Sequence, residues 1–100
     1  MEINKTRSDN DGILLEIKGK LTAVEESAFQ EAVNEAIAGT NNLTLDLENV
    51  HYISSSGLRI LVSAKKQIDA KGGVLSIINA CKDVRDVFEI TGLSDLFGLQ

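Results

Sequence analysis

The chain has 100 residues and a formal net charge of −5, with 43% hydrophobic and 25% charged residues. This length and composition are typical of one globular domain, which we predict to span residues 1–100. The acidic balance and the lack of a basic run argue against binding to nucleic acid or to an anionic membrane. No apolar stretch is long enough to span a bilayer and the first residues do not resemble a signal peptide, so we expect a cytoplasmic protein.

Few residues could hold a metal ion. The chain has one cysteine, Cys81, and one histidine, His51, so an internal disulfide is impossible and paired ligands of these types are missing. We therefore predict no metal and no cofactor. Cys81 is expected to be a small, at least half-buried thiol without a chemical role.

Two strands are predicted first. Residues 2–7 alternate weakly between polar and apolar side chains, which is typical of an edge strand. A polar turn at residues 8–12 then leads into a more apolar strand from Ile13 to Gly19, a pattern that favours antiparallel pairing.

A capping box and an apolar stripe predict the first helix. The Thr22 hydroxyl is expected to accept from the Glu25 N–H while the Glu25 side chain reaches back, and Gly39 is expected to end the helix. Apolar residues that follow the helical period form one stripe: Val24, Ala28, Phe29, Ala32, Val33, Ala36 and Ile37.

Alternating leucines at positions 43, 45 and 47 predict a third strand, which Val50, Tyr52 and Ile53 continue. A second helix is expected from Ser55 to Lys71, followed by Gly72 and Gly73. Its inward side chains would be Leu58, Leu61, Val62, Ile68 and the aliphatic stem of Lys65.

The remainder of the chain predicts a short apolar strand at residues 74–78 and a third helix marked by Val84, Val87, Phe88 and Thr91. Residues 93–100 fit either a short helix or a strand. The element order β-β-α-β-α-β-α predicts an α/β fold, with a mixed β-sheet and helices packed mainly on one face.

Three consecutive serines, Ser54 to Ser56, lie where the third predicted strand meets the second predicted helix. The simplest interpretation is helix capping, because serine is a preferred N-cap residue. The amino end of a helix also favours an anion, so phosphorylation and ligand binding are the alternatives. Phosphorylation here would add about −1.5 to −2 charges without opposing the helix dipole.

Four stretches carry a family resemblance: GKLTAVEESAFQEAV, LDLENVHYISSSGLRILVSAKKQIDAKGG, VLSIINA and VRDVFEITGLSDLF. Together they resemble the STAS family, the sulphate-transporter and anti-sigma-factor-antagonist domains, from about Ile13 to Phe97. The resemblance implies a STAS-like sandwich. It also implies a bacterial anti-sigma factor antagonist that binds an anti-sigma factor with serine kinase activity. Phosphorylation would release the partner, and a PP2C-type serine phosphatase would restore binding.

The family motif, Asp-Ser-Ser/Thr-Gly, places the phosphorylated serine at Ser55, with Ser56 and Ser54 as alternatives. Two positions differ from the family pattern, because Ser54 replaces the motif aspartate and Thr22 replaces another acidic residue found in many members. The resemblance predicts a partner-binding surface formed by Thr22, Ser54, Ser55, Ser56, Gly57, Leu58 and Arg59. Leu58 is expected to point inward, and the chain is expected to be a monomer or a weak dimer.

Three other functions compete with this prediction. A non-switching STAS module could serve as a transporter subunit or a scaffold, and a receptor could bind a nucleotide or another small ligand at the same helix end. A hydrolase would use His51 as the base for Ser55. The chain lacks the G-x-S-x-G turn and a third orienting group, so we predict no enzyme.

Overall fold

A computed structural model describes residues 2–7 and 11–98 of the chain. Four strands form one sheet in the order β1-β2-β3-β4. β1 pairs with β2 antiparallel, whereas β2 with β3 and β3 with β4 pair parallel, so the predicted mixed sheet is confirmed. The bounds are β1 (Glu2–Arg7), β2 (Ile13–Leu21), β3 (Asn42–Ile53) and β4 (Val74–Ile78). β2 therefore extends two residues beyond the predicted end, and part of the turn predicted at 8–12 lies outside the described residues.

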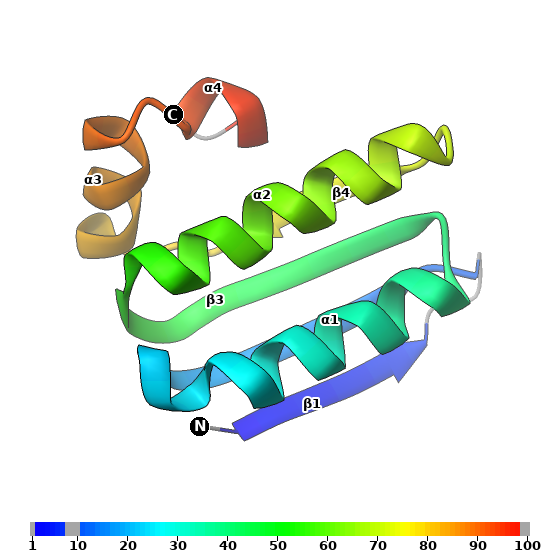
Figure 1. The fold of residues 1–100 in the computed structure, drawn as a ribbon, viewed down its shortest axis with the longest axis horizontal. Helices are drawn as coiled ribbons and strands as arrows, with labels where there is room; N and C mark the ends of the chain where they lie inside the picture. Colours follow the sequence, from blue (N-terminus) through cyan, green and yellow to red (C-terminus); the bar gives the residue numbers. More distant parts are fainter. Residues whose placement is uncertain (1, 8–10, 99–100) are drawn as a thin grey trace.

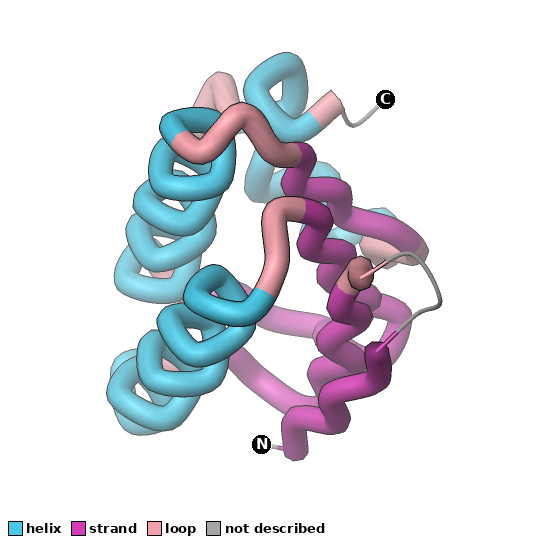
Figure 2. The backbone as a smooth tube through the Cα atoms, turned by 90° about the vertical axis from the view of Figure 1, so that its right-hand side faces the viewer, coloured by secondary structure: helices cyan, strands magenta, loops and turns pink. Residues whose placement is uncertain are grey.

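The helical segments lie in two groups: two long helices cover one face of the sheet, and two short helices lie toward its β4 edge (Figure 1, Figure 2). They are the 3₁₀ turn η1 (Ala23–Glu25), α1 (Glu26–Gly39), α2 (Ser55–Ala70), α3 (Lys82–Ile90) and α4 (Ser94–Phe97). α1 and α2 lie side by side across the sheet, and α3 packs against β3. This arrangement confirms the predicted α/β fold. Within residues 2–7 and 11–98, no helix combines the length and apolar character that a bilayer span needs.

The core forms between the helix layer and the inner face of the sheet. Leu43, Leu45 and Leu47 alternate along β3 with more exposed residues and are fully buried, as are Val33 of α1 and Ile68 of α2. Because alternate strand residues point to opposite faces, the same pattern leaves the outer sheet face to polar and half-buried side chains. The packing of α1 and α2 on the inner face of the sheet thus agrees with these apolar periods.

Two helix faces differ from the prediction. Val24 is 88% exposed and Ala28 is exposed, so the apolar stripe of the first helix begins only at Phe29. Val24 lies in the 3₁₀ turn, whose three residues per turn rotate it away from the stripe that α1 continues. On α2, Ile60 and Ala64 are buried although neither was among the side chains predicted to face inward. Both become buried because α2 packs against α1 as well as against the sheet.

The C-terminal segment, which the pattern left open between helix and strand, is the short helix α4. Its Phe97 ring meets the Phe88 ring of α3 edge to face, with centroids 5.3 Å apart. The Leu93 N–H donates to the Phe88 carbonyl at 2.7 Å, which closes the turn between the two helices. A four-residue helix has little stability of its own, so this aromatic contact is what holds α4 in place.

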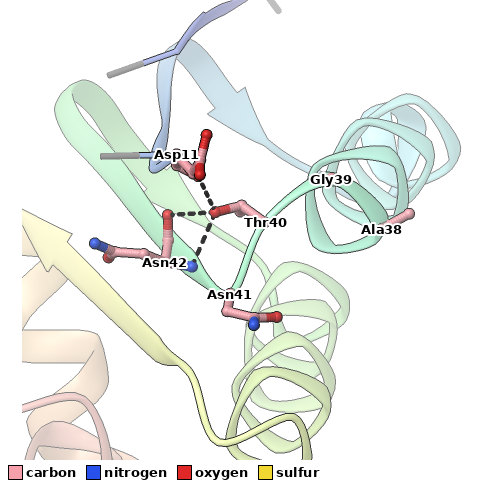
Figure 3. A pocket seen from close by; sticks show the side chains of 6 residues that line it. All are labelled: Asp11, Ala38, Gly39, Thr40, Asn41 and Asn42. Atoms are coloured by element: carbon pink, nitrogen blue, oxygen red, sulfur yellow. Dashed lines mark hydrogen bonds between the residues drawn. The ribbon is translucent and has the colours of Figure 1, made fainter. Parts of the chain in front are cut away.

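Hydrogen bonds fix the connection from α1 to β3 at Thr40 (Figure 3). The Thr40 hydroxyl is 2.5 Å from the Asp11 carbonyl oxygen and 3.2 Å from the Asn42 carbonyl oxygen, and it accepts from the Asn42 N–H at 2.9 Å. A pocket of about 490 Å³ opens here, lined by Asp11, Ala38, Gly39, Thr40, Asn41 and Asn42. Because the hydroxyl is already bonded within the chain, we interpret this end of the sheet as structural.

Lys71 closes the carboxyl end of α1. Its ammonium group donates to the Ile37 carbonyl and, at 2.9 Å, to the Thr40 carbonyl. A cation at this position also favours the negative end of the helix dipole. We expect Lys71→Met to lower the free energy of unfolding by about 1 kcal/mol, measured by urea denaturation.

The matched control is Lys66→Met, because Lys66 is exposed in α2, the helix that Lys71 follows, and has no bonded partner among the described residues. We expect that change to alter stability by less than about 0.5 kcal/mol. Equal effects of the two substitutions would mean that the Lys71 contacts contribute nothing specific.

Candidate functional site

The three serines occupy the turn from β3 into α2. Ser54 has an extended backbone at the N-cap, with φ −81° and ψ 168°, and its side-chain oxygen accepts from the Gly57 N–H at 3.1 Å. Its carbonyl accepts from the Leu58 N–H at 3.0 Å, which begins the helical ladder. Ser54 is therefore the helix cap, and capping alone leaves the other two hydroxyls without an assigned role.

Ser55 and Ser56 lie in the first turn of α2 but in different surroundings. Ser55 is exposed, and its hydroxyl makes no hydrogen bond to any described residue. Ser56 is half-buried and lines a groove of about 280 Å³ between α1 and α2. The backbone N–H groups of Ser55 and Ser56 make no hydrogen bond to other described residues, as expected at the start of a helix. Ser55 is thus the hydroxyl most accessible to another protein.

The serine turn is joined to the turn that follows β2. The Ser54 N–H donates to the Leu21 carbonyl at 2.8 Å, and Leu21 is paired in register with Ile53. A β-carbon at Gly57 would lie 3.0 Å from a side-chain carbon of Ile53 and 3.3 Å from that of Leu21. Glycine therefore allows α2 to start close to the sheet, and Thr22 is placed beside the serines.

Thr22 does not form the predicted capping box. Its hydroxyl donates to the Glu25 carboxylate, while the Glu25 N–H bonds to the Thr22 carbonyl at 3.1 Å. The predicted hydroxyl-to-N–H cap is wrong because the chain makes a 3₁₀ turn here, and α1 begins only at Glu26. The hydrogen bond from Thr22 lowers the pKa of Glu25 below its ordinary value. Thr22 thus holds the Glu25 carboxylate within the 3₁₀ turn, where the sequence predicted Glu25 in a capping box but not in the partner-binding surface.

The other predicted contact residues divide by burial. Gly57 and Leu58 are buried, with Leu58 only 7% exposed, so the prediction that Leu58 points inward is confirmed. Arg59 is exposed one turn beyond Ser55 and lines the same groove as Ser56. The accessible surface around the serines therefore comes from Thr22, Ser55, Ser56 and Arg59.

The remaining reactive side chains do not gather at this site. Cys81 is half-buried, and its thiol lies 3.4 Å from the Val50 carbonyl oxygen. In the part of the chain that the structure describes, no three His, Cys, Asp or Glu side chains are grouped so that they could hold a metal ion. The chemistry available here is that of a free hydroxyl at the positive end of a helix.

Comparison with known proteins identifies the family. The profile described as the STAS domain matches residues 2–100. The chain belongs to the STAS domain family. BtrV of Bordetella bronchiseptica is 35% identical over 92 residues, which cover 87% of this chain and 77% of BtrV. The anti-sigma-B factor antagonist of Bacillus subtilis is 25% identical over 99 residues, which cover 99% of this chain and 90% of that protein.

Solved STAS structures share the fold. The Bacillus protein SpoIIAA, an anti-sigma factor antagonist, has been solved in unphosphorylated and phosphorylated forms. Its unphosphorylated form has a TM-score of 0.82 at 18% identity and covers 94% of this chain and 84% of SpoIIAA. The phosphorylated form has a TM-score of 0.76 at 17% identity, with 94% and 86% covered. The four-stranded mixed sheet and its helices are therefore those of a STAS domain.

The family resemblance places Ser54 at the position of the motif aspartate, and the Ser54 side chain caps α2 by accepting from the Gly57 N–H. We expect Ser54→Ala to lower the free energy of unfolding by about 1 kcal/mol, because the Gly57 N–H loses its acceptor. Ser54→Asp should restore the loss, since aspartate caps a helix equally well. Urea denaturation measures all three chains, and equal stability of Ser54→Ala and the parent would show that this bond is not stabilising.

Proposed function

We propose that this STAS domain is an anti-sigma factor antagonist, a regulatory binding protein and not an enzyme. In its unphosphorylated form it binds an anti-sigma factor that has serine kinase activity. Phosphorylation of Ser55 ends the complex, and a PP2C-type phosphatase restores binding. The proposal includes action in the cytoplasm by a single domain over residues 1–100.

The observation that carries the proposal is the environment of Ser55. Its hydroxyl is exposed at the first position of α2 and has no bonded partner in the described structure, while Ser54 caps the helix and Ser56 is half-buried. A kinase can reach such a hydroxyl without unfolding the helix. The named relatives support the same assignment, because they are anti-sigma factor antagonists and SpoIIAA exists in a phosphorylated form.

The switch follows from charge at a contact surface. A neutral Ser55 adds a small polar group to the surface that Thr22, Ser56 and Arg59 complete. Phosphate would add about −1.5 to −2 charges to this surface, so a partner with acidic groups or a closely fitted surface would be repelled. A coupling of about 1–3 kcal/mol is enough to change binding by one to two orders of magnitude. The fold need not change.

Co-purification from the native bacterium tests the proposal. Tagged chain should retain a protein with an ATP-binding serine kinase domain, and addition of ATP should release it with phosphate on Ser55. Phosphate mapped to Ser56 or Ser54 would move the site within the turn. Capture of a transporter ATPase instead, with no phosphorylation, would replace the proposal with a non-switching STAS module. Heat of binding with GTP or ATP alone would favour a nucleotide receptor.

A further inference from the structure

Lysines in two helices of this chain pair with a carboxylate one turn further on. In α2, the Lys65 ammonium is 2.8 Å from the Asp69 carboxylate, and in α3 the Lys82 ammonium is 2.9 Å from that of Asp86. Both pairs are four residues apart, which places the two side chains on the same helix face. These pairs show the spacing at which a helical cation of this protein meets an anion.

Arg59 has no anionic side chain four residues away, in contrast to Lys65 and Lys82. The residues four positions before and after it are Ser55 and Ser63, both neutral. Its guanidinium makes no ion pair and no hydrogen bond with any described residue. Glu26 of α1 lines the same groove, yet the two side chains do not come within ion-pair distance. Arg59 is therefore an unpaired cation whose neighbour one turn back is the proposed phosphorylated residue.

We propose that Arg59 binds the phosphate of Ser55 within the same chain, which defines how the switch works at this site. The inference rests on the proposed phosphorylation of Ser55. An anion four residues before a cation is the more favourable order on a helix. The planar guanidinium can donate two parallel hydrogen bonds to phosphate oxygens, a geometry that a lysine ammonium cannot reproduce.

The internal pair makes phosphorylation change two groups at once. Before phosphorylation, Arg59 is free to contact a partner across the groove beside Ser56. After phosphorylation, its donors are taken up by the phosphate and are no longer available to a partner. The complex therefore loses a favourable contact of Arg59 in addition to gaining an unfavourable charge.

The test installs phosphoserine at position 55 during translation, so no kinase is needed. The measured quantity is the second pKa of the phosphate, followed by ³¹P NMR during a pH titration. The guanidinium favours the dianion, so the second pKa of the phosphate should be lower in the parent chain than in Arg59→Gln. The dianion of the parent chain should therefore bind a proton about twofold to tenfold more weakly. Arg59→Lys should give an intermediate value.

Lys66→Gln is the matched control, because it removes a cation from α2 at a position three turns from Ser55. Glu25 and Glu26, the carboxylates of the neighbouring turn and helix, remain in every variant. The proposal is overturned if Arg59→Gln leaves the phosphate pKa unchanged, or if Lys66→Gln shifts it as much. Because phosphate is installed directly, this outcome is independent of whether a kinase modifies Ser55.

Discussion

Replacing Ser55 by alanine is expected to abolish phosphorylation of the chain while its binding to the anti-sigma factor persists. The hydroxyl is the acceptor in our proposal, yet it makes no hydrogen bond within the described structure, so its loss removes no stabilising contact. The free energy of unfolding should change by less than about 0.5 kcal/mol. Incorporation of labelled phosphate from ATP, measured with the co-purified kinase, should fall to the background level of a reaction without the chain.

Ser55→Glu should give the opposite binding result. A carboxylate at the first helical position suits the helix dipole, so folding is retained. The same charge at the contact surface should weaken binding to the anti-sigma factor about 10- to 100-fold, within the usual range of such couplings. Titration calorimetry with the purified partner measures the change in Kd.

Ser56→Ala is the matched control for both experiments, because it removes a neighbouring hydroxyl of the same helix turn that is only half-exposed. It should leave labelling largely intact. Labelling that persists in Ser55→Ala and disappears in Ser56→Ala would reassign the acceptor to Ser56. Equal affinity of Ser55→Glu and the parent chain would contradict a charge-based switch.

The sequence predicted most of the fold because its signals are local. Glycines mark the end of α1 at Gly39 and the residues after α2, and the leucine alternation in β3 locates the inner face of the sheet. The serine turn could be predicted for the same reason, since a strand pattern stops and a helix pattern starts around Ser54. The exposure of Ser55 could not, because it depends on how the turn is placed against β2.

The parts that sequence reasoning missed depend on contacts between distant segments. Thr22 and Glu25 have the spacing of a capping box, but the hydroxyl bonds to the carboxylate in a 3₁₀ turn. Ile60 was not among the side chains of α2 that the sequence predicted to face inward. It is buried because α1 packs against α2. The bonds from Lys71 to α1 join residues more than 30 positions apart, and no local pattern indicates them.

Gly72 and Gly73 look equivalent in the sequence, but the structure gives them different roles. Gly72 has φ +75°, a left-handed conformation that ends α2, and a β-carbon there would meet open space. A β-carbon at Gly73 would lie 2.0 Å from the carbonyl oxygen of Asn41 and 2.9 Å from its carbonyl carbon. The same oxygen accepts from the Val74 N–H at 2.8 Å, so the bond that starts β4 beside β3 prevents the two segments from separating.

We therefore expect Gly73→Ala to lower the free energy of unfolding by about 3 kcal/mol or more, because backbone atoms must move and the Val74 bond must lengthen. Gly72→Ala, the matched control, should lower the free energy of unfolding by only about 1 kcal/mol, because alanine is disfavoured in the left-handed conformation. Urea denaturation followed by circular dichroism at low temperature measures both, and a Gly73→Ala chain already unfolded without urea also fits the expectation. If the two substitutions cost the same, the close approach of Gly73 to Asn41 does not limit the packing of β4 against β3.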